Sequence, residues 1–313
     1  DDEARGYLES AGVLGLETPV ERLQHMNQPA YEFYLNRNPG IDLAADRLEI
    51  GVCAQHNNGG IDVDLWWRSS IAGLFPVGEA AGAHGVARPG GAALNSAQVG
   101  ATRAAQWIAA REQGAARADE GWQELAGDAL QKARSLLEAA CGREESSGVL
   151  IDDVLMESTR AMSDNAGLVR SRQGLEELAR NVAEWRRRVV DECVVDPTSR
   201  RSVDRLFLVR DILDVQAVYV AAMLDHLDHG VGSRGSVLYT DPDGDLPVSW
   251  WNDGADLDVE EIFRHRLDSK AHHGVTQRVS VDAVGEAIHA HWGPVRPIPT
   301  EDEFLENVWK TYR

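Results

Sequence analysis

Residues 84–94 read His-Gly-Val-Ala-Arg-Pro-Gly-Gly-Ala-Ala-Leu, a stretch in which small residues surround one histidine and one arginine. The paired glycines Gly90 and Gly91 allow the backbone to approach a planar ring without a Cβ clash. Small residues at helical spacing continue to about Arg111, so we expect a helix that begins near Gly91. Its free N–H groups and positive dipole end would favour a partner that carries negative charge.

Two further motifs lie upstream. Residues 56–61 read His-Asn-Asn-Gly-Gly-Ile, and residues 70–79 read Ser-Ile-Ala-Gly-Leu-Phe-Pro-Val-Gly-Glu. The apolar run over 71–79 predicts a buried strand that ends on a glycine and an acid, and the alternation over 61–64 indicates a strand as well. Each motif alone is weak, because a histidine beside asparagines and glycines is common in surface turns.

In this order the three motifs resemble the C-terminal half of the flavin-binding domain in the succinate dehydrogenase, fumarate reductase and L-aspartate oxidase flavoprotein family. That family shows His-x-x-Gly-Gly-[IV], then a strand ending in Gly-Glu, then His-Gly-x-x-Arg-x-Gly-[GS]-x-x-Leu. The resemblance continues at residues 162–170, Met-Ser-Asp-Asn-Ala-Gly-Leu-Val-Arg, and at residues 233–235, Ser-Arg-Gly. It covers about residues 50–240, and the residues after 240 match no pattern of the family.

The resemblance implies an FAD-dependent oxidoreductase that transfers a hydride between flavin and a small carboxylate-bearing substrate. His56 and Arg88 correspond to the residues that bind the substrate carboxylates, and they are the expected catalytic residues. Arginine suits this role because its planar fork pairs bidentately with a carboxylate and stays charged. The expected cofactor-binding residues are Gly59, Gly60, Glu79, Gly90, Gly91, Ala93 and Leu94.

The sequence departs from the family in three places. The usual Asn-Ser before Leu94 is Ala92-Ala93, which leaves only backbone groups for the flavin, and Asn57-Asn58 follow His56 in place of commoner residues. The dinucleotide fingerprint Gly-x-Gly-x-x-Gly should lie upstream, yet its only match, residues 230–235, follows a helical pattern. We therefore expect a C-terminal fragment or one subunit of a split enzyme, which lacks FAD and turnover without its N-terminal half.

The expected fold class is α+β, mainly α. The expected domains are a helical tail of the capping region over 1–48, the C-terminal part of the FAD-binding domain over 49–117, an antiparallel helical bundle over 118–230 and a mixed C-terminal extension over 231–313. Helices are expected near 119–141, 148–163, 171–193 and 199–228. Thr18 to Glu21 predicts a capped helix start, with the helix running to about Tyr34, and Asp-Pro-Asp-Gly-Asp at 241–245 predicts a turn cluster.

Composition limits the partners. With 31 basic and 51 acidic residues the net charge is −20, which argues against nucleic acid. No apolar run is long enough to span a bilayer, and three cysteines without metal spacing indicate a reducing compartment. We expect a cytoplasmic protein, or one peripheral to the cytoplasmic membrane. His272 and His273 are interpreted as surface residues rather than metal ligands, and Trp66 and Trp67 as packing or interface residues.

Two alternatives stay open at this point. The helical region over 118–229 could be a non-catalytic interaction module that docks a partner subunit, and an electron-transfer partner is expected in the enzymatic reading. The half-domain over 49–112 would expose surface that the missing half normally covers, so either disorder of this segment or dimerisation through it is also expected. A strand–Gly-x-Gly-x-x-Gly–helix in the upstream reading frame would favour the enzyme.

Overall fold

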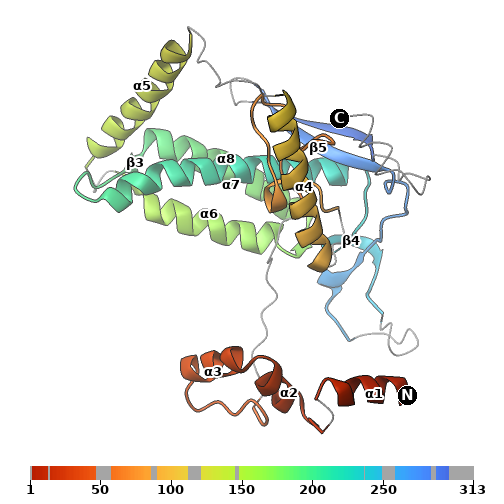
Figure 1. The fold of residues 1–313 in the computed structure, drawn as a ribbon. Helices are drawn as coiled ribbons and strands as arrows, with labels where there is room; N and C mark the ends of the chain where they lie inside the picture. The colour runs from red at the N-terminus through yellow and green to blue at the C-terminus, as the bar shows by residue number, and fades with distance from the viewer. Residues whose placement is uncertain are drawn as a thin grey trace. The chain divides into compact units, whose positions relative to one another are not determined.

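The computed structural model describes residues 2–12, 15–46, 58–85, 90–111, 121–144, 148–235, 237–248, 258–282 and 287–295. The chain divides into two compact units, Asp1–Gln55 and His56–Arg313, which are described separately below. Helices dominate the described residues and the strands are few and short (Figure 1). The prediction of a mainly helical fold is confirmed. Among the described residues, none of the helices has the length and apolar character that crossing a bilayer requires.

The first unit contains α1 Asp2–Ser10, α2 Pro19–Met26 and α3 Gln28–Arg37. The predicted capping box is present before α2. The Thr18 hydroxyl accepts a hydrogen bond from the Glu21 N–H at 3.2 Å, and the Glu21 carboxylate accepts one from the Thr18 N–H at 2.8 Å. These hydrogen bonds lower the pKa of Glu21.

The prediction of one continuous helix from Thr18 to Tyr34 is wrong, because the helix is interrupted at Asn27. Asn27 ends α2 and caps α3, where its side chain accepts a hydrogen bond from the Ala30 N–H at 3.3 Å. Pro29 explains the break, since proline has no N–H for a helix interior and its ring clashes with the preceding turn. No residue of α2 or α3 is buried, so these helices are held by their caps rather than by a packed core.

In the second unit, four long helices follow residue 121: α5 Trp122–Cys141, α6 Ile151–Ala166, α7 Arg172–Asp191 and α8 Arg200–Asp228. Each lies within a few residues of its predicted bounds. The helices α6, α7 and α8 pack against one another, whereas α5 reaches this group only near its C-terminal end, through Leu136, Leu137 and Ala140 (Figure 1). The core is therefore a three-helix bundle with α5 attached at its edge.

Apolar spacing accounts for this core. On α7, Leu175, Leu178, Val182, Trp185 and Val189 recur every three or four positions and are all buried. Matching rows come from α8 and α6, namely Leu206, Val209, Leu213, Val220, Ile151 and Val154. Burying one such valine or leucine stabilises a fold by about 1.5–3 kcal/mol. These rows explain why the bundle forms from the residues of this chain alone.

Two pairs of short parallel strands close the ends of the bundle. β1 Val149–Leu150 pairs with β3 Cys193–Val194, and β2 Val169–Arg170 pairs with the start of β4 Leu238–Asp245. Burial raises the pKa of the Cys193 thiol to about 11. The β1–β3 pair thus joins segments on either side of α6 and α7, and the β2–β4 pair joins segments on either side of α7 and α8.

The predicted turn cluster over 241–245 is wrong, because these residues form the second half of β4. A neighbouring segment supplies the partner that the sequence pattern did not reveal. The Asp241 N–H donates to the Arg264 carbonyl at 2.8 Å, and both Thr240 and Asp245 form bridges with His265. Pairing across this distance in the chain overrides the local turn preference of Asp, Pro and Gly.

The C-terminal part also contains the 3-10 helix η3 Glu261–Phe263 and an antiparallel hairpin, β5 Val275–Val281 with β6 Ile288–Pro294. Asp225 of α8 holds this hairpin, since its carboxylate oxygen accepts hydrogen bonds from Gln277 Nε2 and Trp292 Nε1, both at 2.7 Å. The hairpin is thereby tied to the last turn of the longest bundle helix.

Residues 58–111 contain α4 Gly90–Arg111 and the 3-10 helix η1 Gly78–Ala80. The helix after the glycine pair is as predicted, but the strand predicted over 71–79 is wrong. Among the described residues this region has only one bridge, between Ile61 and Ala81, and that bridge is also all that forms of the strand predicted over 61–64. A buried parallel strand needs neighbours on both edges and cover on both faces, and the described residues do not supply them.

Candidate functional site

The two residues predicted to bind substrate, His56 and Arg88, lie outside the described residues. Their roles therefore stay predictions. The segments beside them are described: residue 58 lies two positions after His56, and α4 begins two positions after Arg88. These segments carry all seven residues that were predicted to bind the cofactor.

The backbone at Gly60 crosses the segment that follows Glu79 at very short range. A Cβ added at Gly60 would lie 2.6 Å from the Ala80 carbonyl oxygen and 2.9 Å from the Gly82 nitrogen. Two hydrogen bonds hold the crossing, from Ile61 N–H to the Ala80 carbonyl and from Gly82 N–H to the Ile61 carbonyl, both 2.9 Å. Gly60 is thus required where one backbone passes another, a requirement that the sequence reasoning missed.

Gly59 differs from its neighbour. A Cβ added at Gly59 would have no atom of the described chain within 4 Å. The backbone at Gly59 is therefore open to an approaching ligand, whereas Gly60 is already in contact with its own chain. Sequence reasoning assigned one role to both glycines, and no sequence signal distinguishes them, because the crossing joins segments about twenty residues apart.

Glu79 lies in η1, just before this crossing, and is exposed. Gly78 has φ +65, a left-handed conformation that glycine adopts without strain, and it turns the chain into η1. The short helix packs on α4, with the Cβ position of Gly78 3.8 Å from Ala97 Cβ. The structure thereby places the acid-bearing turn against the first half of α4.

The first turn of α4 contains Gly90, Gly91, Ala93 and Leu94. The first N–H groups of a helix have no intrahelical partners and carry the positive end of the dipole. A Cβ added at Gly91 would meet no atom within 4 Å, and the Leu94 side chain is 73% exposed. These features fit the binding of a flat cofactor with an electron-rich edge, such as FAD, because they offer open backbone donors beside an apolar contact.

A turn at residues 64–68 packs on the middle of α4. Asp64 shapes it by accepting hydrogen bonds from the N–H groups of Trp66 and Arg68, at 2.8 and 3.0 Å. Partial burial opposes ionisation of Asp64, but the hydrogen bonds from Arg68 outweigh it and lower the pKa of this carboxyl. The rings of Trp66 and Trp107 lie 5.7 Å apart. Trp66, predicted with Trp67 to be a packing or interface residue, is therefore in a packing contact.

Several large apolar side chains of this region are exposed. They are Ile61, Ile71, Leu74, Val77, Leu94, Val99 and Ile108. Exposed apolar surface rich enough to include several such side chains often marks an interface. This surface is available for a further part of the protein or for another chain.

A buried carboxylate lies in the C-terminal part. The Asp268 side chain is 2% exposed, with Arg234 at 3.5 Å, His272 at 3.3 Å and His273 at 3.5 Å. The interpretation of His272 as a surface residue is wrong, since its side chain is only 22% exposed and contacts this carboxylate. No group of histidine, cysteine and acidic residues within the described part of the chain is arranged to hold a metal ion.

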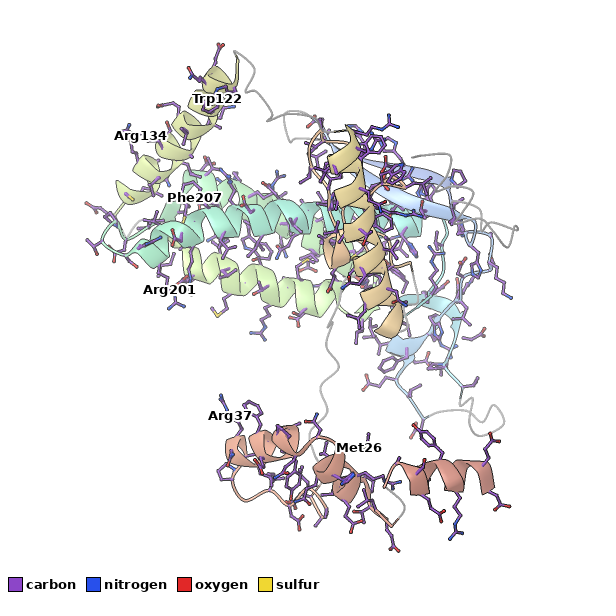
Figure 2. All side chains as sticks on the ribbon, viewed as in Figure 1. Met26, Arg37, Trp122, Arg134, Arg201 and Phe207 are labelled. Carbon is purple, nitrogen blue, oxygen red and sulfur yellow. The ribbon has the colours of Figure 1, made fainter. Side chains whose placement is uncertain are left out.

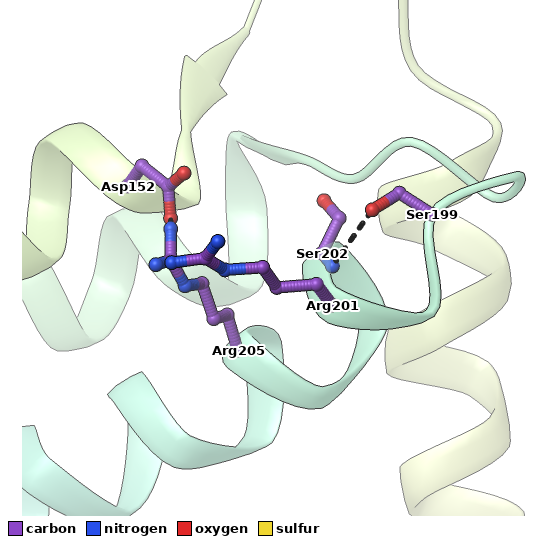
Figure 3. A pocket seen from close by; sticks show the side chains of 5 residues that line it. All are labelled: Asp152, Ser199, Arg201, Ser202 and Arg205. Atoms are coloured by element: carbon purple, nitrogen blue, oxygen red, sulfur yellow. Dashed lines mark hydrogen bonds and ion pairs between the residues drawn. The ribbon is translucent and has the colours of Figure 1, made fainter.

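Two hollows lie among the described residues. One, of about 240 Å³, is at the N-terminus of α8 and is lined by Asp152, Ser199, Arg201, Ser202 and Arg205 (Figure 3). Arg205 pairs with Asp152 inside it. The other, of about 640 Å³, is lined by side chains from residues 62–75 and by Arg278. Neither contains a residue predicted to bind substrate or cofactor.

The helix that starts at a glycine pair and the bundle of long helices are both features that the resemblance to flavoprotein oxidoreductases predicts. Comparisons with known proteins bear on this directly. No protein-family model matches the chain. Among curated proteins, the CoM/CoB fumarate reductase of Methanothermobacter marburgensis has a subunit that is 39% identical over 66 residues, which are 21% of this chain and 12% of that one. The L-aspartate oxidase of Pyrococcus furiosus is 36% identical over 86 residues, 27% of this chain and 18% of that protein.

Among solved structures, the similar folds also belong to fumarate reductase and succinate dehydrogenase proteins. A quinol fumarate reductase of E. coli is similar with a TM-score of 0.67 at 19% identity, over 90% of this chain and 44% of that one. Sdh1 of Mycobacterium smegmatis is similar with a TM-score of 0.58 at 20% identity, over 93% of this chain and 44% of that one. The predicted resemblance to the fumarate reductase and succinate dehydrogenase flavoproteins is confirmed. The chain spans less than half the length of these proteins.

Proposed function

We propose that this chain forms the C-terminal portion of an FAD-dependent oxidoreductase that acts on a carbon–carbon or carbon–nitrogen bond beside a carboxylate. The observation that carries the proposal is the open first turn of α4, which begins at the glycine pair and lies beside the turn that bears Glu79. By "the complete protein" we mean this chain together with the part of its relatives that it does not span, in one polypeptide or in two.

FAD would supply the hydride acceptor or donor. The chain's own residues would bind it and shape its electrostatics. The N–H groups of the first turn of α4, at Gly91 to Leu94, favour added negative charge at the edge that they face. Glu79, which is exposed on η1, would accept hydrogen bonds from cofactor hydroxyls. Gly59 provides open backbone on the other side of the crossing.

Arg88 and His56 would hold the substrate carboxylate. Negative charge grows toward that carboxylate as hydride is transferred, and positive groups already in position stabilise it more than they stabilise the ground state. Arg88 lies just before α4, so its guanidinium and the N-terminus of α4 would act on the same end of the site. Under this proposal the arginine two residues before the glycine pair and the start of α4 serve the same substrate group.

The exposed apolar side chains of residues 61–108 support a second part of the proposal. We infer that they contact the flavin-binding half that this chain does not span, whether that half is in the same polypeptide or in another. The 71–77 segment, in which Ile71, Leu74 and Val77 are exposed, has no ladder partner among the described residues and would pair in that assembly. The chain by itself would then be inactive, because half of the site would be absent.

Replacement of Arg88 tests the substrate role in the complete protein. We expect Arg88→Ala to lower kcat/KM by at least about a hundredfold, because a charged hydrogen bond to the reacting carboxylate is lost, while bound FAD per chain stays at the wild-type level. Arg201→Ala, which alters an exposed arginine on α8 (Figure 2), is the matched control and should keep full activity. Normal turnover by Arg88→Ala would remove Arg88 from the site.

A second candidate, a non-catalytic docking module, is favoured by one observation. α5 contacts the bundle only near its C-terminal end, and Trp122 at its other end is 51% exposed (Figure 2). In this reading α5 binds a partner and no flavin is involved. FAD titration of the complete protein distinguishes the two, since saturable binding would favour the enzyme and no binding would favour the module.

A further inference from the structure

The contact between Trp67 and Gly100 breaks two local rules at once. Trp67 has φ +58, a left-handed conformation that costs a residue other than glycine about 1–2 kcal/mol. Gly100 lies in the interior of α4, where glycine costs about 1 kcal/mol relative to alanine. Two unfavourable local conformations meet at this one contact, which indicates that the contact has a structural or functional role.

The Trp67 ring packs so closely on Gly100 that no side chain can be accommodated at position 100 without a shift. Gly100 is buried, and a Cβ added there would lie 2.5 Å from Trp67 Nε1 and 2.6 Å from Cε2. Within the described residues the indole Nε1 is buried and has no hydrogen-bond acceptor. The ring is therefore pressed directly against the helix backbone. Any larger residue at position 100 must displace either the ring or the helix.

Further contacts extend the attachment along α4. One turn after Gly100, Arg103 donates a hydrogen bond to the Leu65 carbonyl at 3.1 Å. Another turn on, the Arg68 guanidinium lies 4.0 Å from the centre of the Trp107 ring. The turn at 64–68 thus holds α4 at three successive levels, and this sets both the rotation of the helix and its position along its axis.

The attachment has a consequence at the other end of α4. Gly91 lies nine residues before Gly100, or about 14 Å along a rigid helix with a rise of 1.5 Å per residue. A shift of the helix at Gly100 is therefore carried to the first-turn N–H groups. The turn at 64–68 follows shortly after the crossing at Gly60 and Ile61, which also lies next to Glu79. By holding α4, the turn therefore fixes the position of the start of α4 relative to this crossing.

We propose that Trp67, Gly100 and Arg103 form a positioning lock that sets the N-terminus of α4 against the flavin. The inference rests on the proposed function, and it assigns residues that do not contact the cofactor. If the lock is loosened, the positive end of α4 moves away from the edge that gains charge on reduction. The reduced form then loses stabilisation, so the midpoint potential becomes more negative and FAD binds more weakly.

Gly100→Ala in the complete protein tests the lock. We expect FAD affinity to fall about tenfold or more and, at saturating FAD, the midpoint potential to become more negative. Gly127→Ala in the interior of α5, where an added Cβ meets no atom within 4 Å, is the matched control and should change neither quantity. A variant that keeps both the wild-type affinity and the wild-type potential would overturn the lock.

Arg103→Ala covers the case in which Gly100→Ala does not fold, because it removes a hydrogen bond without adding atoms to the contact. It should shift the potential in the same direction, and Arg103→Lys, which retains a donor, should restore part of the shift. Unchanged potential in Arg103→Ala would count against the lock. Absence of FAD binding by the wild-type protein would instead overturn the proposed function, so the two failures are distinguishable.

Discussion

At the scale of single residues, the clearest result concerns two adjacent glycines with different tasks. Gly60 is enclosed by the backbone of Ala80 and Gly82, whereas Gly59 is open. The sequence motif Gly-Gly does not separate them, because the backbone that encloses Gly60 comes from a segment far along the chain. The motif predicted one role for both glycines, whereas Gly60 is needed for the backbone crossing and Gly59 stays a candidate binding position.

Gly60→Ala should therefore destabilise the chain, while Gly59→Ala should not. The added Cβ at Gly60 would meet backbone atoms at 2.6–2.9 Å, and backbone held by hydrogen bonds cannot move aside cheaply. We expect a loss of about 2 kcal/mol in the free energy of unfolding, measured by urea denaturation of this chain. Equal stability of the two variants would show that the crossing at Gly60 does not form.

Asp225 is a second residue with a disproportionate role, since it accepts hydrogen bonds from both strands of the β5–β6 hairpin. Asp225→Ala leaves Gln277 and Trp292 without this acceptor, and hydrogen bonds to a charged group contribute about 1.5–3 kcal/mol each. We expect faster proteolysis within residues 275–294, followed by mass spectrometry. Asp211→Ala, on the exposed face of the same helix, is the control. Equal cleavage rates for the two variants would contradict the tie.

At the scale of elements, the four long helices after residue 121 were predictable and the strands were not. α7 and α8 could be placed to within a few residues because their apolar rows and serine caps are local signals. The predictions for residues 71–79 and 241–245 were wrong in opposite ways. The first has strand-like residues but no partner strands among the described residues, and the second has turn-like residues but acquires partners at Arg264 and His265.

The same contrast applies to the candidate site. The start of α4 at the glycine pair was predicted, whereas Glu79 was predicted at the end of a strand and lies in the 3-10 helix η1. The attachment of the 64–68 turn to α4 was not predicted, because its meaning depends on which helix turn faces Trp67. Sequence spacing could not have indicated that the helix turn containing Gly100 is the one that faces Trp67. A glycine in the interior of an otherwise helical run was the one signal present.

At the scale of the whole molecule, the second unit combines a self-sufficient bundle with a region that lacks cover. The bundle buries its apolar rows within this chain, whereas the described residues of 61–108 expose seven large apolar side chains. The chain spans less than half the length of its structural neighbours. Both facts agree with a chain that completes a flavin site together with a further portion, as proposed.

The most direct test of the central claim is hydrogen–deuterium exchange of the complete protein with and without FAD. The account predicts that FAD slows exchange at the amides of residues 91–94, because these first-turn N–H groups would face the cofactor. The first turn of α5, at residues 122–125, has no side-chain cap and serves as the internal control, with unchanged exchange. FAD that binds without slowing exchange at residues 91–94 would contradict the claim that α4 forms one wall of the flavin site.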